Sequence, residues 1–374
     1  MLNIEVSTSS GMKNTISRRD VLQWTLLAAA GTQIRSASAL GATRIGGETS
    51  PSSALDGQQI KDATFGFIER CLQKDGGYSP SLNPGYPGFA DTSMSDLAAV
   101  AYAAILARQV NWPVKHKKRS AEFIQRHQQP DGVFVNHDGK MDPKSDLAVL
   151  YNTVQGVVSL RALGEKPRVN PQKVMDRFFV DQAFAKLPWY TTSFFPLFYA
   201  ALGTDFPSEY RLALERHMTE NQAADGYLQD HVAATFHLVH FYRLIGQPTP
   251  KADAIVQRVL RDQRPDGGWQ LKQDQRWDVH SCFDAVFVLH QIGGNSEACR
   301  AAIDKAADWA LSCQNADGGF GHYPGWHSDM DAVYFQLGTL IQAGRIPGTN
   351  FDLPDGEVLG WGDVMKPGKI YLKN

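Results

Sequence analysis

A short sequence pattern that recurs along the chain constrains the fold more than any other feature. It reads Gln, two residues, Asp-Gly and then an aromatic residue, and two full copies begin at Gln263 and Gln314. Weaker copies lie at residues 222–227 and 128–134, and a shortened copy lies at residues 73–78. Asp-Gly favours a tight turn, because Asp bonds back to the backbone and Gly tolerates positive φ. We therefore expect the repeated residues to build turns and not a catalytic site.

A second pattern, an apolar residue followed by Gly, closes the apolar segments between these turns. It occurs at Gly164, Gly203, Gly246, Gly293 and Gly344, with spacings of 39, 43, 47 and 51 residues. A repeat of this length indicates a helical array or a propeller. Gly commonly ends a helix, since the helix end requires positive φ, so the pattern favours helices. The unit between Gly164 and Gly203 departs from the pattern, because it contains no Asp-Gly turn.

Two kinds of helix are expected to alternate. Residues 96–107 and 281–292 are apolar on nearly every side, which suits helices buried on both sides. Residues 207–221 and 295–314 carry one apolar stripe, as helices with one wet face do. About six helices of each kind fit the chain. This predicts an all-α fold, a closed (α/α)6 toroid, with an open solenoid of the same hairpins as the alternative.

Composition narrows the function without identifying it. The chain has 374 residues, of which 43% are hydrophobic and 20% charged, as in ordinary globular proteins. A formal net charge of -2 does not fit the basic surface of a general nucleic-acid-binding protein. No apolar run reaches the roughly 18 residues of a membrane span. Four cysteines are too few for a disulfide scaffold.

The start of the chain resembles a twin-arginine export signal. Residues 17–23 read SRRDVLQ, a mildly apolar stretch follows at 24–31, and residues 37–39 form a small-residue cleavage pattern. We expect residues 1–39 to be a signal peptide and residues 40–58 to be a flexible leader. The resemblance implies the twin-arginine translocase as a partner during export, and a periplasmic or extracellular location in a bacterium.

The repeat itself resembles a known family. The Gln-x-x-Asp-Gly-Gly-Trp/Phe copies at residues 263–269 and 314–320 are similar to those of squalene/hopene cyclases and protein prenyltransferase β-subunits. The resemblance covers residues 59–346, and it implies the toroid fold and a small apolar or isoprenoid ligand. Residues 347–374 are expected to form an irregular tail. Peripheral contact with a membrane is a further expectation, and no nucleic-acid partner is expected.

Two matched segments lie at the starts of the last two predicted inner helices. One begins at His280 and reads HSCFDAVF, and the other begins at His327 and reads HSDMDAVY. The inner helices of a toroid are parallel to one another, so their N-termini gather at one end. A capping box explains the Ser-x-x-Asp part structurally, but it does not explain the matched histidines. We therefore include His280, His327 and Asp284 in a candidate catalytic site.

The second of these segments also suggests an acid catalyst. Class II terpene cyclases carry Asp-x-Asp-Asp at an inner-helix start, with the middle Asp as the proton donor. Here Asp329-Met330-Asp331-Ala332 matches two of the three acids. The resemblance implies that Asp331 donates the proton and that Asp329 tunes it, since paired carboxylates raise one pKa. Because Ala332 replaces the last acid, a catalytically inert toroid that binds a lipid or a protein is an alternative.

Zinc chemistry is a further hypothesis. Protein prenyltransferases hold zinc with Asp, Cys and His from this region, and Asp278, Cys282 and His327 are of the right types, with His280 beside them. The Asp-x-x-x-Cys spacing differs from the family's Asp-x-Cys, so a site without any cofactor is the first expectation. A third chemistry is a polysaccharide lyase or glycosidase on a toroid, with carboxylates and His as acid and base. The sequence thus favours an exported terpenoid cyclase or prenyltransferase-like toroid that uses acid catalysis at the inner-helix N-termini.

Overall fold

Regular structure is helical throughout the part of the chain that the computed structural model describes. The described residues are 56–88, 90–270 and 279–349. All of them belong to the second of the two units into which the chain divides, residues 1–51 and 52–374. The prediction of an all-α chain is therefore confirmed. The expected signal peptide, most of the leader and tail, and Asp278 lie outside the described residues.

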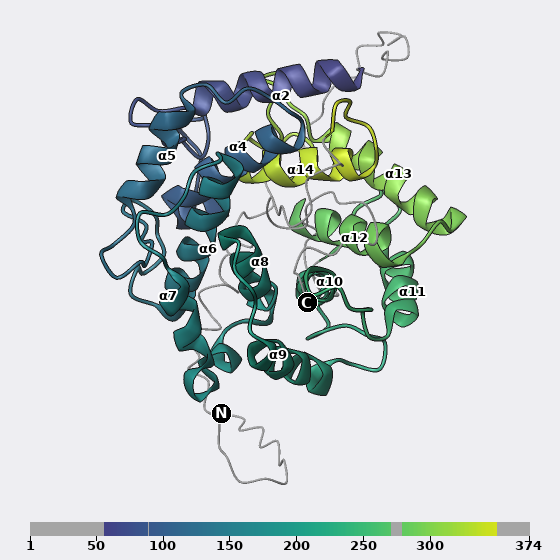
Figure 1. The fold of residues 1–374 in the computed structure, drawn as a ribbon. Helices are drawn as coiled ribbons and strands as arrows, with labels where there is room; N and C mark the ends of the chain where they lie inside the picture. Colours follow the sequence, from purple (N-terminus) through teal and green to yellow (C-terminus); the bar gives the residue numbers. More distant parts are fainter. Residues whose placement is uncertain (1–55, 89, 271–278, 350–374) are drawn as a thin grey trace, which may run out of the picture. The chain divides into compact units, whose positions relative to one another are not determined.

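Six helices form the inner layer of a closed ring (Figure 1). Each inner helix packs against the next along the chain, and the last, α14, packs against the first, α4. This closure confirms the toroid and shows that the alternative of an open solenoid is wrong. The inner helices are α4 (Asp96–Gln109), α6 (Asp146–Ala162), α8 (Phe194–Leu202), α10 (Val232–Leu244), α12 (Val279–Ile292) and α14 (Met330–Gln342).

Six helical segments form the outer layer and alternate with the inner helices along the chain. They are α2 (Gly57–Cys71), α5 (Lys117–Arg126), α7 (Gln172–Asp176) with the 3-10 helix η2 (Arg177–Lys186), α9 (Ser208–Asn221), α11 (Ala252–Asp262) and α13 (Glu297–Ser312). Two short elements, α3 (Asp91–Met94) and η3 (Trp189–Thr191), precede α4 and α8.

Burial separates the two layers as the sequence predicted. In α4 every residue from Leu97 to Ala107 is buried, whereas α11 buries only Ile255 and Val259. A helix between two packed neighbours has no wet face, so it needs apolar residues all round. No helix in the described part of the chain is long and apolar enough to cross a membrane.

The repeat residues are structural and join neighbouring units. The Gln263 side chain donates from Nε2 to Gly267 O within its own turn at 3.1 Å, and to Ala302 O on α13 at 2.8 Å. In the last unit, Gln314 Nε2 lies 3.4 Å from Thr64 Oγ1 on α2. The same side chain that links successive units thus also links the last unit to the first, which helps to close the ring.

Helix ends follow the apolar-Gly pattern with one shift. Gly164 and Gly203 end α6 and α8 with φ of 69° and 79°, which a residue with a side chain rarely adopts. At the end of α12 the positive φ of 61° belongs to Gly294 and not to the predicted Gly293. The predicted irregular third unit is present, since η2 is interrupted by two residues with positive φ.

Candidate functional site

A buried acidic residue lies in the first turn of α14. Asp331 is 0% exposed, and Asp329, also 0% exposed, is the N-cap of this helix. Asp329 Oδ1 accepts a hydrogen bond from Ala332 N at 2.9 Å. The cap holds the start of the helix, and the helix dipole favours negative charge there. Both carboxyl groups are therefore placed by the local structure of one helix N-terminus.

Two histidines from other segments meet these carboxyl groups. His280, in the first turn of α12, donates from Nε2 to Asp331 Oδ2 at 2.7 Å. His322, in the loop before α14, has its Nε2 3.3 Å from Asp329 Oδ2 and 3.5 Å from Asp331 Oδ2. His280 keeps 26% of its side chain exposed, whereas His322 is 3% exposed. Of these four groups, His280 is therefore the one most open to a ligand.

A third carboxyl group reaches the cluster from α3. Asp91, His280 and Asp331 each offer an atom within 4.8 Å of the others. Asp91 Oδ2 also accepts hydrogen bonds from Tyr102 Oη at 3.2 Å and Tyr151 Oη at 3.1 Å. Asp91, Asp329, Asp331, His280 and His322 make up what we call the acid–histidine cluster.

The cluster favours a retained proton. Burial, followed by the negative charge of Asp331, raises the pKa of Asp91 to about 6. Burial also raises the pKa of Asp329, and the adjacent His322 opposes that shift. Carboxyl groups that share a desolvated site cannot all ionise easily. The pKa values of Asp91 and Asp329 are therefore both higher than that of an exposed carboxyl group.

The two oxygens of Asp331 have different surroundings. Oδ2 is held by His280, but Oδ1 is buried and has no hydrogen-bond partner among the described residues. A buried acceptor without a donor costs free energy, on the order of 1–3 kcal/mol. A ligand that donates a hydrogen bond to Oδ1 would relieve this cost.

Aromatic rings of the inner helices adjoin the cluster. The ring of Phe335 lies 4.1 Å from His280 and 5.2 Å from Phe283, centroid to centroid. Tyr334 stacks on Tyr102 with 4.3 Å between centroids. The faces of such rings carry partial negative charge and attract cations. The site thus combines an acid with groups that can stabilise positive charge.

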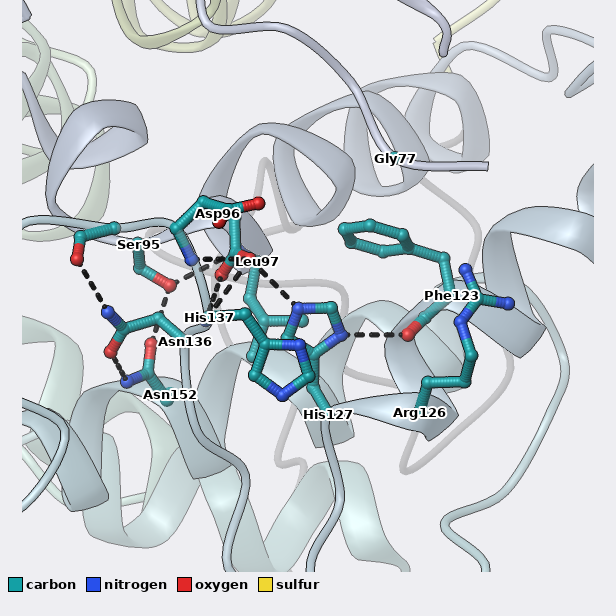
Figure 2. Close-up of polar contacts among 12 residues, drawn as sticks. Gly77, Ser95, Asp96, Leu97, Phe123, Arg126, His127, Asn136, His137 and Asn152 are labelled. Atoms are coloured by element: carbon teal, nitrogen blue, oxygen red, sulfur yellow. Dashed lines mark hydrogen bonds and ion pairs between the residues drawn. The ribbon is translucent and has the colours of Figure 1, made fainter. Parts of the chain in front are cut away.

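A polar network at the start of α4 supports α3 (Figure 2). Ser95 donates to Asn152 Oδ1 at 2.5 Å, and Asn152 donates to Asn136 Oδ1 at 2.8 Å. Asn136 in turn binds the carbonyl oxygen of Met141, whose N–H donates to Met94 O at the end of α3. This chain of contacts ties the loop at residues 136–141 to the helix that carries the third carboxyl of the cluster.

The same view shows an Asp–His pair that has a structural role. His127 lies between two acceptors, with Nε2 2.9 Å from Asp96 Oδ2 and Nδ1 2.9 Å from Phe123 O. Burial raises the pKa of Asp96, but the hydrogen bond and charge of His127, with two backbone N–H groups, outweigh burial and lower it. The His137 ring stacks on His127 at 4.1 Å. The pair anchors the loop to α4.

Other residues predicted for the catalytic site lie outside the cluster. Asp284 is buried on α12, one turn after His280, and belongs to neither group of three metal-capable side chains. His327 is exposed, and its Nδ1 lies 2.8 Å from Asn83 Nδ2. The matched histidines thus separate, because His327 precedes the N-cap of α14 whereas His280 lies within α12.

The zinc set predicted from the sequence is only partly among the described residues, because Asp278 lies outside them. Cys282 is buried, and its sulfur accepts from Trp269 N at 3.4 Å. Neither Cys282 nor His327 belongs to a cluster of three metal-capable groups in residues 56–349 that the structure describes, and Asp278 lies outside them. Two other groups of three side chains could hold an ion. One is Asp91, His280 and Asp331, and the other is His322, Asp329 and Asp331.

The capping explanation for Ser-x-x-Asp is wrong for Ser328, because Asp329 is the N-cap of α14. Ser281 donates to Trp269 O at 2.8 Å, and Ser328 donates to Asp317 Oδ1 at 2.7 Å. Both serines therefore bind the repeat turn before their helix. Asp329 performs the capping in α14.

The model of the prenyltransferase alpha-alpha toroid domain family matches residues 49–158 and 144–357. The chain belongs to this family. The similarity to prenyltransferases and cyclases that the repeat predicted is confirmed.

Individual relatives of this toroid are distant. Protein farnesyltransferase subunit beta of Pisum sativum is 26% identical over 145 residues, which cover 37% of this chain and 32% of the pea protein. The match thus spans about a third of that relative's length.

Solved structures share the toroid fold. A type II terpene cyclase, MstE from Scytonema, in complex with merosterolic acid A has a TM-score of 0.52 at 14% identity, covering 78% of this chain and 98% of that one. Candida albicans protein geranylgeranyltransferase-I complexed with GGPP has a TM-score of 0.52 at 14% identity, covering 76% and 90%. Similarity at this level establishes the fold alone.

Sequence reasoning missed Asp91 and His322. Asp91 belongs to the first unit and His322 directly follows the last repeat turn, so neither lies in the matched segments. Their position relative to Asp331 depends on ring closure and on the course of a loop. The sequence offered only a weak signal near Asp91: Ser93 and Asp96 have the same Ser-x-x-Asp spacing as the two matched segments.

Proposed function

We propose that this toroid is an acid catalyst that protonates an apolar isoprenoid at the N-terminal ends of its inner helices. The observation that carries the proposal is Asp331, which is fully buried. One of its oxygens is bound by His280, and the other has no hydrogen-bond partner among the residues that the structure describes. Such a carboxyl group is oriented, and its free oxygen is the atom from which a proton would leave.

In the proposed step, Asp331 Oδ1 transfers its proton to one carbon of a C=C bond. The π electron pair forms the new C–H bond, and the other carbon becomes a carbocation. The faces of Phe335, Phe283 and Tyr334 would attract that positive charge. His280 would hold Oδ2 of the resulting carboxylate, and a later loss of a proton from carbon would complete an isomerisation or cyclisation.

After turnover, the rest of the cluster would return a proton to Asp331. The pKa of Asp91 is raised to about 6, by burial first and by the charge of Asp331 second, so this carboxyl group can return a proton after turnover. Ala332 stands where the related cyclases have a third acid, and Asp91 brings a third carboxyl group from another element. This placement favours a live site over an inert one.

The comparisons support the ligand class. The Scytonema cyclase structure contains merosterolic acid A, described as its product, and the Candida transferase structure contains GGPP. The shared fold makes an isoprenoid the first ligand to test with this chain.

The test offers squalene and geranylgeraniol to the purified protein in D2O. Protonation of an alkene by the enzyme would leave one non-exchangeable deuterium in the product. Asp331→Asn should lower turnover by about 10³-fold, within the range for loss of a positioned general acid. Asp304→Asn, whose side chain is 60% exposed on an outer helix, is the matched control and should keep full activity.

Three results would contradict the proposal. One is a product without deuterium, and another is a variant at Asp331 that remains active within tenfold. Tight binding of the isoprenoid without any product would instead favour an inert binding toroid. A large loss of melting temperature in Asp331→Asn would show a structural role, so circular dichroism accompanies the assay.

A metal-assisted reaction is a second candidate, because Asp91, His280 and Asp331 offer three ligand atoms within 4.8 Å of one another. Carboxylate and imidazole are suitable zinc ligands. A divalent ion bound there would supply a fixed positive charge for an anionic substrate group. Metal analysis of protein purified without chelator decides between the two: bound zinc that is lost in His280→Ala would favour this candidate, and its absence together with turnover would favour acid catalysis.

We also propose that the chain is exported by the twin-arginine route, on the strength of residues 1–39. When the full chain is expressed in a bacterium with that translocase, the protein recovered from the periplasm should begin at Leu40, as measured by mass spectrometry. Changing both Arg18 and Arg19 to Lys should retain it in the cytoplasm. Equal export of this variant would contradict the proposal, as would an uncut N-terminus.

A further inference from the structure

We propose that a pocket at the C-terminal ends of α4, α6 and α8 binds a small amphiphilic anion, with a phosphate or carboxylate head on an apolar chain. The pocket has a volume of about 520 Å³, which is in the usual range for small-molecule sites. It is distinct from the acid–histidine cluster. Helix α4 has 14 residues, so its ends are about 20 Å apart, and the cluster lies at the opposite end of the inner helices.

Basic side chains dominate the polar part of the pocket. Two of them come from the last turns of α4 and α6, one begins α5, and one lies in the loop after α6. The α5 lysine leans over the end of α6, since its Nζ is 3.5 Å from where a Cβ on Gly164 would stand. One acid lines the pocket with them. The five charged residues are Arg108, Lys117, Arg161, Lys166 and Glu165.

Three of the cations have no partner in the chain as described. No ion pair or hydrogen bond to another described residue is made by the side chains of Lys117, Arg161 or Lys166, and none of the three pairs with the nearby Glu165. Arg161 is half-buried, so its guanidinium loses part of its hydration without gaining an acceptor. A desolvated charge without a partner is costly, and an anionic ligand would remove that cost.

The negative charge of the helix C-termini offsets only part of the positive charge of these side chains. Each helix C-terminus carries about half a negative elementary charge, so the three ends at the pocket together offset about 1.5 charges. The lining side chains carry four positive charges and one negative charge. A net positive potential remains, and it selects an anion.

The walls of the pocket indicate the rest of the ligand. Val157, Ala162, Ala201 and Leu202 give it an apolar side, which suits a hydrocarbon chain. Thr204 also lines it, and its hydroxyl is buried and has no hydrogen-bond partner among the described residues. That hydroxyl is a donor available to an anionic head group.

Two sources could supply such a ligand: a soluble amphiphile or the head group of an anionic lipid. The first arm of the experiment is calorimetric titration of the full chain with hexyl phosphate. We expect binding to the unchanged protein, about tenfold weaker binding to Arg161→Gln, and a similar loss in Lys166→Gln, which is exposed and cannot disturb the core. Glu165→Gln should bind about threefold more tightly, because it removes the one negative side chain among the described lining residues.

The matched control is Lys118→Gln. Lys118 neighbours Lys117 on α5 and is exposed, but it does not line the pocket, so this variant should bind as the unchanged protein does. The second arm measures cosedimentation with phosphatidylglycerol and phosphatidylcholine vesicles. Retention on the anionic vesicles that is lost in Arg161→Gln assigns the pocket to a lipid head group, and binding in the first arm alone assigns it to a soluble amphiphile.

The proposal is overturned by an absence of binding in both arms. It is also overturned if Lys118→Gln and Arg161→Gln weaken binding equally, since that would be general electrostatic attraction. Hexanol binding as tightly as hexyl phosphate would exclude an anionic head group. These outcomes do not depend on the acid–histidine cluster, because none of the variants touches it.

Discussion

The carboxyl group of Asp91 should make the stability of the fold depend on pH in a predictable direction. Its pKa is raised from 3.8 to about 6 by burial and by the charge of Asp331. A folded-state pKa above the unfolded value means that the folded protein holds the proton more tightly. The stabilising contribution is therefore complete below pH 3.8 and is lost as pH rises through about 6.

The size of the effect follows from the shift. A change of one pKa unit corresponds to about 1.4 kcal/mol, so ionisation of Asp91 should lower the free energy of unfolding by about 3 kcal/mol. The charge of Asp331 acts from within 4.8 Å. Coulomb's law gives about 1 kcal/mol at this distance in water and about 3.5 kcal/mol at an effective dielectric constant of 20. His280 opposes this repulsion, and burial supplies the larger share of the shift.

A double-mutant cycle of Asp91→Asn and Asp331→Asn isolates this interaction. Urea unfolding followed by circular dichroism gives the free energy of unfolding of all four proteins at about pH 4 and at about pH 7. Replacing Asp91 by Asn should raise the free energy of unfolding, relative to the unchanged protein, by about 2.4 kcal/mol more at the higher pH than at the lower one. In the Asp331→Asn background this gain should shrink by about 1–3 kcal/mol.

The cycle can refute the reasoning in two ways. If Asp91→Asn changes stability equally at both pH values, Asp91 does not titrate between them and its pKa is not raised. If the coupling between the two substitutions is the same at both pH values, the carboxyl groups do not repel each other in the folded protein. The first result would remove the proton store on which the acid-catalysis proposal depends, and the second would leave burial as the cause of the raised Asp91 pKa.

Three further predictions concern the fold. Gly318→Ala should destabilise the protein by about 1–3 kcal/mol more than Gly325→Ala, because both positions have positive φ but only the first would place a Cβ 2.3 Å from a backbone oxygen of α2; equal melting temperatures would contradict this. Cys71 and Cys313, whose buried thiols have pKa values raised to about 12 by burial, should not react with Ellman's reagent until the protein unfolds, and rapid reaction of the native protein would contradict their burial. His127→Ala should cost about 3–5 kcal/mol of stability, since it leaves a partly buried carboxylate without its partner, and a loss below about 1 kcal/mol in urea unfolding would show that the pair is dispensable.

The sequence determined the architecture because its signals are local. The Asp-Gly turns, the glycines at helix ends and the two kinds of apolar periodicity each act within one turn or one helix, so they can be recognised in the linear chain. Their repetition implied a ring of paired helices. The Gln263 and Gln314 contacts show how a short repeat also joins units. The position of Asp329 and Asp331 at a helix start followed from the same local rules.

The tertiary structure decided which polar side chains meet. Asp91 and Asp331 come from opposite ends of the repeat array, and only ring closure between α4 and α14 brings them within reach. The two matched histidines looked equivalent in sequence, yet His280 binds the cluster and His327 points to Asn83. A shift of a few residues in the start of a helix changes the direction in which a side chain points, and the local sequence pattern does not show that shift. The pairing of distant units depends on packing between helices, which is why it required the folded ring.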